Sequence, residues 1–80
     1  MTISIAHVNL TRAYRGGERQ TELLIRELEK KDVRQVLITR HNSVLAERLQ
    51  DVDLEIRPVS SSRLAVTRAT RDVDLVHVHE

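Results

Sequence analysis

The 80-residue chain carries a formal net charge of +1, with 40% hydrophobic and 31% charged residues and no cysteine. This balance is typical of one small globular domain and excludes a disordered chain, a disulfide-stapled scaffold and a cysteine-based zinc site. The net charge gives no reason to expect a nucleic-acid partner. There is no apolar run long enough for a transmembrane helix and no secretory signal, so we expect a cytoplasmic protein.

The predicted core is thin, because Tyr14 is the only aromatic residue. A chain of this size without staples usually gains only about 3–5 kcal/mol from its core. We therefore expect either a piece of a larger protein or a chain that associates.

Residues 3–10 are predicted to form a buried strand, because apolar residues occupy both of its faces. A loop over residues 11–17 follows. A helix is predicted over residues 18–31, since its acidic start and its Lys30-Lys31 end both suit the helix dipole. Within this helix, Glu22 and Glu27 are each followed four residues later by a basic residue, Arg26 and Lys31 respectively, in the favourable orientation.

A second strand is predicted over residues 33–39, followed by a turn over residues 40–43. Ser43 is a suitable N-cap for a short helix over residues 44–50, and Glu47 lies near the position that a capping box requires.

The third strand is predicted over residues 54–59, and Pro58 indicates that it lies at an edge of the sheet. The serines at 60–62 read as a linker before a third helix over residues 63–71. The fourth strand is predicted over residues 75–79.

Strands that alternate with helices predict the α/β class with a parallel sheet. The expected fold is β-α-β-α-β-α-β, a partial Rossmann-like doubly wound sheet with strand order 3-2-1-4. Residues 1–80 would then be an incomplete N-terminal Rossmann-like domain. The fourth strand would be an exposed edge carrying Val76 and Val78, which a native domain rarely leaves open.

Residues 15–20, with the sequence RGGERQ, join the first strand to the first helix. A glycine turn at a helix start points backbone N–H groups at a ligand, most often a phosphate. Gly16 and Gly17 fit a simple tight turn equally well. The segment is neither the GxGxxG fingerprint of dinucleotide binding nor a P-loop.

Three histidines, His7, His77 and His79, lie on the first and fourth strands, which would be neighbours in the sheet. His-x-His pairs can chelate a metal, but no third ligand with suitable spacing follows, so no metal is expected. We expect His7 and His77 to be core residues, each with a satisfied hydrogen bond. His79, at the tip of its strand, is the candidate for the ligand cleft.

Taken together, five segments resemble the N-terminal part of retaining glycosyltransferases with two Rossmann domains (GT-B), in particular the family-four enzymes that include lipopolysaccharide-core sugar transferases. They are residues 5–9 (IAHVN), 15–20 (RGGERQ), 22–24 (ELL), 36–38 (VLI) and 74–79 (DLVHVH). The resemblance covers the whole chain but only about the first fifth of such an enzyme.

The resemblance implies an acceptor-side segment of an enzyme that moves a sugar from a nucleotide-sugar to a glycan or lipid-linked acceptor. Gly16 and Gly17 would contact the donor diphosphate. The implied residues of the substrate cleft are Arg15, Glu18, Arg19, Gln20 and His79. No metal and no cofactor beyond the nucleotide-sugar co-substrate is implied, and no catalytic residue is assigned.

The family's C-terminal domain and the rest of its N-terminal sheet are absent from these 80 residues, so the chain alone is not expected to transfer sugar. The implied location is the cytoplasm, either free or peripheral to the inner membrane face.

Two other interpretations remain open. The chain could be a small non-enzymatic α/β module that associates with itself through its exposed strand edge. It could also be a fragment of a Rossmann oxidoreductase, but the second strand ends in Thr39-Arg40-His41 without the expected acidic residue. Arg40 would then have to bind a 2′-phosphate.

Overall fold

A computed structural model of the chain describes residues 2–10, 16–59 and 63–79. Strands and helices alternate along the described chain in the predicted order. The elements are β1 (Ile3–Asn9), α1 (Gly16–Leu28), β2 (Val33–Thr39), α2 (Val44–Arg48), β3 (Glu55–Pro58), α3 (Arg63–Ala69) and β4 (Leu75–His79).

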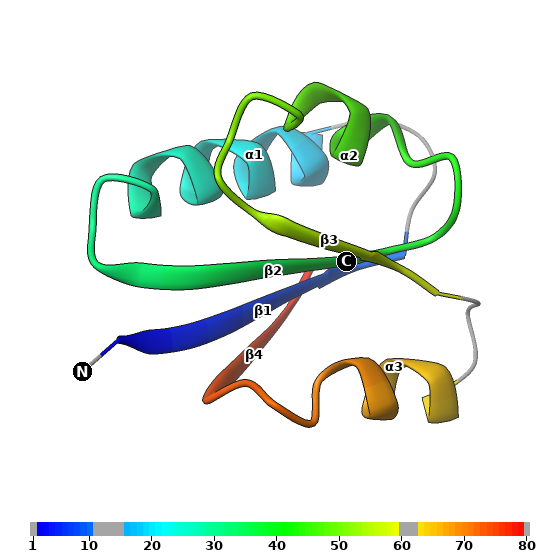
Figure 1. The fold of residues 1–80 in the computed structure, drawn as a ribbon. Coiled ribbons are helices and arrows are strands. Elements are labelled where there is room, and N and C mark those ends of the chain that lie inside the picture. Colours follow the sequence, from blue (N-terminus) through cyan, green and yellow to red (C-terminus); the bar gives the residue numbers. More distant parts are fainter. Residues whose placement is uncertain (1, 11–15, 60–62, 80) are drawn as a thin grey trace.

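The four strands form one parallel sheet in the order β3-β2-β1-β4, which confirms the predicted fold class and strand order (Figure 1). β1 pairs along its whole length with β2, from Ile3 opposite Val33 to Asn9 opposite Thr39. Where β4 enters the sheet, the backbone N–H of Ser4 donates to an Asp74 carboxylate oxygen at 2.7 Å, and the backbone N–H of Asp74 donates to the Ser4 carbonyl at 2.9 Å.

The helices cover both faces of the sheet, with α1 and α2 on one side and α3 on the other (Figure 1). The side chains therefore form two apolar clusters. The cluster beneath α1 and α2 consists of Ile25, Leu37, Leu45, Leu49 and Val52. The cluster toward α3 consists of Ala6, Val8, Val36 and Ile38, with Val66 and Ala69 of α3 packed against it. Alternation along β2, with Val36 and Ile38 on one face and Leu37 on the other, requires both layers.

Several elements differ from the predictions at their ends. α1 begins at Gly16, two residues before the predicted start, and ends at Leu28, because residues 29–32 form a turn. Glu27 consequently pairs with Lys30 at 3.2 Å rather than with the predicted Lys31, whereas the predicted pair of Glu22 and Arg26 is present at 3.1 Å.

Ser43 is the N-cap of α2, as predicted, and its hydroxyl oxygen accepts a hydrogen bond from the backbone N–H of Ala46 at 3.3 Å. The predicted capping box is wrong, because Ala46 occupies the third helical position and Glu47 lies one residue beyond it. Pro58 ends β3 at the border of the sheet, so the prediction of an edge strand is confirmed.

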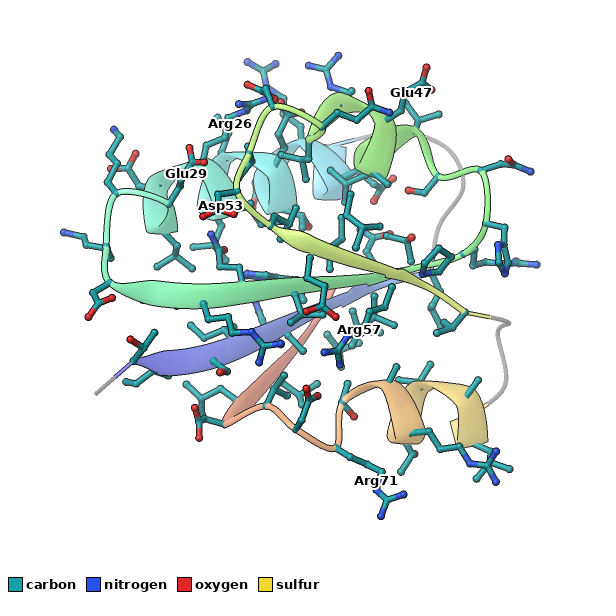
Figure 2. The ribbon with its side chains drawn as sticks, viewed as in Figure 1. Arg26, Glu29, Glu47, Asp53, Arg57 and Arg71 are labelled. Atoms are coloured by element: carbon teal, nitrogen blue, oxygen red, sulfur yellow. The ribbon has the colours of Figure 1, made fainter. Side chains whose placement is uncertain are left out.

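Short polar contacts hold the connecting segments in place. At the end of α1, the Glu29 carboxylate accepts a hydrogen bond from the backbone N–H of Asp53 at 2.9 Å, and Figure 2 shows the two residues on neighbouring segments.

Arg71, after the end of α3, points away from the sheet into solvent (Figure 2). None of the helices within the described ranges is long and apolar enough to cross a membrane.

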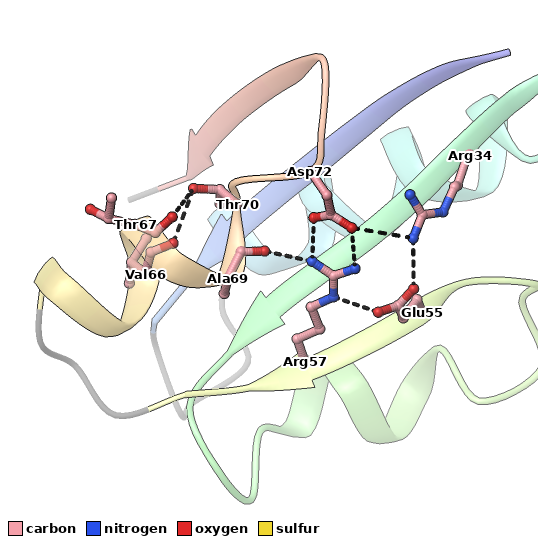
Figure 3. A network of polar contacts seen from close by, with 8 residues as sticks. All are labelled: Arg34, Glu55, Arg57, Val66, Thr67, Ala69, Thr70 and Asp72. Atoms are coloured by element: carbon pink, nitrogen blue, oxygen red, sulfur yellow. Dashed lines mark hydrogen bonds and ion pairs between the residues drawn. The ribbon is translucent and has the colours of Figure 1, made fainter.

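A polar cluster is centred on Arg57 of β3 (Figure 3). Its guanidinium donates to both carboxylate oxygens of Asp72, at 2.8 and 2.9 Å, and to the carbonyl of Ala69 at the end of α3. It also pairs with Glu55, which receives a second hydrogen bond from Arg34 of β2 at 2.9 Å. Arg57 lowers the pKa of Asp72 to about 2. The cluster therefore ties the end of α3 to β3 and, through Glu55, to β2.

We expect Arg57→Ala to destabilise the protein by about 1 kcal/mol, the usual scale for one lost intramolecular hydrogen bond, because the Ala69 carbonyl loses its donor. Amide hydrogen exchange should accelerate first in α3 and β4. Arg71→Ala is the matched control, since Arg71 is exposed. Equal protection of α3 in the two variants would contradict a clamping role for Arg57.

Candidate functional site

The carboxyl ends of the parallel strands meet at one edge of the sheet, where open α/β sheets bind their ligands. β1 ends there at Asn9 and β2 at Thr39, and each of these side chains is only 1% exposed. α1 begins seven residues after the end of β1, at Gly16. The start of α1 and the ends of β1 and β2 therefore bound the candidate site.

Gly16 and Gly17 are exposed and form the first two residues of α1, a helix of 13 residues. A Cβ atom at Gly16 would meet no neighbouring atom within 4 Å among the described residues, and neither glycine has a positive φ. Among the described residues, packing and backbone conformation therefore give no reason for glycine at position 16. No described residue occupies the space that a side chain there would take.

The remaining predicted cleft residues are either buried, exposed or outside the part of the structure that describes side chains. Glu18 is buried at 3% exposure, whereas Arg19 and Gln20 are exposed. Arg15 lies outside the described residues. The backbone of His79 pairs with Asn9 at the carboxyl end of β4, and its side chain lies outside the described part of the structure.

A buried polar chain crosses from β1 to α1 behind this edge. His7 is completely buried, and its Nε2 lies 2.9 Å from the side-chain oxygen of Gln35. The Gln35 amide nitrogen donates to the carbonyl of Ile25 at 3.0 Å. Because a carbonyl can only accept, this bond turns the Gln35 oxygen toward His7, and Nε2 of His7 must be the donor. The prediction that His7 is a hydrogen-bonded core residue is confirmed.

The same prediction for His77 is wrong. His77 pairs with His7 in the sheet, and the two rings lie 6.3 Å apart at 64°, but His77 is exposed. The difference arises because β1 is a central strand, whereas β4 is an edge strand whose side chains are exposed from Leu75 to Val78. Within the described ranges, no group of three or more histidine, cysteine or acidic residues could hold a metal ion.

The outer surface of α1 carries a second set of charges. Glu22 is nearly buried and pairs with Arg26 at 3.1 Å and Arg48 at 2.8 Å. Arg26 also donates to both carboxylate oxygens of Asp51, at 2.9 and 3.1 Å, and lowers the pKa of that carboxyl. Next to these pairs, Arg19 borders an open hollow of about 280 Å³.

A larger hollow lies at the carboxyl ends of β2 and β3, beside α2. Its volume is about 450 Å³, and its walls include Arg40, His41, Glu47, Gln50 and Ile56. Sequence reasoning treated residues 40–43 as a turn and missed this space, because its walls come from three elements between Thr39 and Pro58. The available signal was the Arg-His pair directly after a buried strand.

Comparisons of the chain with models of protein families, with curated proteins and with solved structures find no match.

Burial lowers the pKa of His7, its hydrogen bond with Gln35 acts in the opposite direction, and His77 lowers the pKa further. As the pH falls, His7 therefore binds a proton in the unfolded chain, near pH 6.5, before it does so in the folded chain. We expect the contribution of His7 to the free energy of unfolding to fall as the pH drops below about 7, by at most about 1.4 kcal/mol per pH unit.

His7→Gln keeps a donor for Gln35 and cannot titrate, so its pH dependence should be flatter than that of the parent chain. Urea unfolding at a series of pH values measures this difference. Leu23→Val, at an exposed position without a titratable group, should retain the slope of the parent chain. Parallel curves for His7→Gln and the parent chain would exclude His7 as the titrating group.

Proposed function

We propose that this chain is the N-terminal, acceptor-side segment of a glycosyltransferase that transfers a sugar from a nucleotide-sugar to a glycan or lipid-linked acceptor. The observation that carries the proposal is the exposed Gly16-Gly17 start of α1 at the carboxyl edge of a parallel sheet. The sequence resemblance described above supports the same assignment.

The chemistry of sugar transfer gives these glycines a role. The bond between the anomeric carbon of the sugar and the diphosphate breaks as a bond to the acceptor oxygen forms, and negative charge develops on the departing nucleoside diphosphate. Backbone N–H groups and the positive end of a helix dipole stabilise such charge without a bound metal. In this proposal a side chain at Gly16 would obstruct the approach of the diphosphate, because no described residue occupies that space.

In this proposal, the 80 residues supply one wall of the cleft, and a second Rossmann domain holds the nucleotide. The nucleotide-sugar is a co-substrate, and no further cofactor is needed. Arg19 and Gln20, which are exposed in the first turns of α1, would contact the substrates. The chain alone should bind a diphosphate weakly and should not turn over a sugar donor.

Gly16→Val tests this role, because the described structure has room for the added side chain. Helix propensity should change little, since valine is no worse than glycine within a helix. We expect the parent chain to bind inorganic pyrophosphate and UDP in an NMR titration, with shifts at the amides of residues 16–20. The variant should bind each about tenfold more weakly at unchanged melting temperature.

Leu23→Val is the matched control, because Leu23 is an exposed residue of the same helix. It should leave both affinities unchanged. Absence of pyrophosphate and UDP binding in the parent chain, or equal affinity in Gly16→Val, would refute the proposed diphosphate site. Tighter binding of NAD than of UDP would favour the oxidoreductase interpretation instead.

A second candidate function is self-association through β4, and the exposure of this edge strand favours it. Leu75, Val76 and Val78 are 50–59% exposed, although they are apolar and lie on both faces of the strand. The free N–H and C=O groups of an edge strand can pair with another strand. Two copies joined antiparallel through β4 would form one continuous sheet and bring their valines together.

We expect Val78→Lys to prevent this association, because a charged side chain on an edge strand opposes strand addition. Sedimentation velocity over a range of concentrations should reveal a dimer of the parent chain and a monomer of the variant. Leu64→Lys places the same charge on an equally exposed residue of α3 and should leave the dimer intact. A parent chain that stays monomeric at every concentration would reject the second candidate.

A further inference from the structure

The arginines that are partly withdrawn from water differ in their partners. Within the described ranges these arginines are Arg26, Arg40 and Arg57. Arg26 donates to both carboxylate oxygens of Asp51, and Arg57 does the same with Asp72. No described carboxylate lies within ion-pair distance of Arg40.

This difference matters because a guanidinium loses hydration when it is partly buried, and a carboxylate or phosphate with two oxygens in one plane compensates best. Arg19, Arg68 and Arg71 also have no described carboxylate partner, but they are exposed to solvent. Among the half-buried arginines of the described chain, Arg40 thus differs in having no described carboxylate within ion-pair distance.

The place of Arg40 indicates where such a partner would sit. Arg40 lines the hollow of about 450 Å³ at the carboxyl ends of β2 and β3. His41 lies on the same rim and adds a second nitrogen donor. Ile56 and Pro58 supply an apolar wall, while Glu47 of α2 and Gln50 of the turn after it supply polar groups.

These walls match the parts of an acidic sugar. The anionic group of such a sugar would pair with Arg40, its ring C–H groups would lie against Ile56 and Pro58, and its hydroxyl groups would donate to the Glu47 carboxylate. Glu47 would repel a second negative charge, so the site suits a ligand with one anionic end and a neutral polyol body. A bare diphosphate fits this description less well.

We propose that the hollow beside Arg40 binds a small sugar that carries one phosphomonoester or carboxylate group, and that this sugar is the acceptor of the transfer reaction. The assignment as acceptor rests on the proposed function, whereas the binding site rests on Arg40 and the hollow. The acceptor site would lie at the ends of β2 and β3, separate from the diphosphate contact at Gly16.

The probes are glucose 6-phosphate, glucuronate and uncharged glucose, titrated into the 80-residue chain and followed by NMR. We expect the two acidic sugars to shift the amides of residues 39–43 and of α2, and glucose to shift neither set. Arg40→Gln should weaken binding of both acidic sugars about tenfold or more, because the paired guanidinium contact is lost. Arg71→Gln, the exposed control, should bind as the parent chain does.

The proposal would be overturned if folded Arg40→Gln bound the two acidic sugars with the same affinity as the parent chain. Equal shifts around Arg68 and Arg71 would also overturn it, because they indicate nonspecific attraction to positive charge. Tighter binding of 2′-AMP than of glucose 6-phosphate would replace the acidic sugar with a nucleotide. Gly16→Val should not alter the binding of glucose 6-phosphate. The proposed diphosphate site and the proposed acidic-sugar site can therefore be confirmed or refuted independently.

Discussion

The structure depends on the burial of β1 between two other strands and beneath helices on both faces. From Ala6 to Asn9 every side chain of this strand is at most 3% exposed. A parallel strand in this position needs crossover connections, and these bring α1 and α2 to one face of the sheet and α3 to the other. The same parallel pairing gathers the carboxyl ends of the strands at one edge, where both proposed ligand contacts lie.

Burial of β1 also determines which polar groups the interior can hold. His7 is accepted because Gln35 and the Ile25 carbonyl complete a hydrogen-bonded chain, so no donor of that chain loses hydration without replacement. A partly buried guanidinium likewise needs hydrogen-bond acceptors that replace the water it has lost. The carboxylates of Asp51 and Asp72 satisfy Arg26 and Arg57, and a ligand would satisfy Arg40 in the same manner.

The sequence predicted the strands well because parallel strands in a two-faced core read as continuous apolar runs. The bounds of β2 and β4 match residues 33–39 and 75–79. Helix ends were less predictable, since the start of α1 at Gly16 and its end at Leu28 depend on local turns that hydrophobic periodicity does not encode.

Whether a side chain is buried could be predicted only where the position of its strand in the sheet, central or edge, was known. His7 and His77 occupy paired positions in similar apolar surroundings of the sequence, but one lies in a central strand and the other in an edge strand. The glycine contact could be proposed from a local motif. The hollow beside Arg40 could not, because β2, α2 and β3 must first be assembled before its walls exist.

The pairing of Ser4 with Asp74 joins residues that are 70 positions apart. Closing so long a loop costs more chain entropy than pairing β1 with β2 through the nearby α1. We therefore expect β1, α1 and β2 to form the folding nucleus, and β4 to dock late. In native-state fluctuations the same strand would be the first to detach, so the edge of the sheet would exchange between attached and detached states while the remaining three strands stay paired.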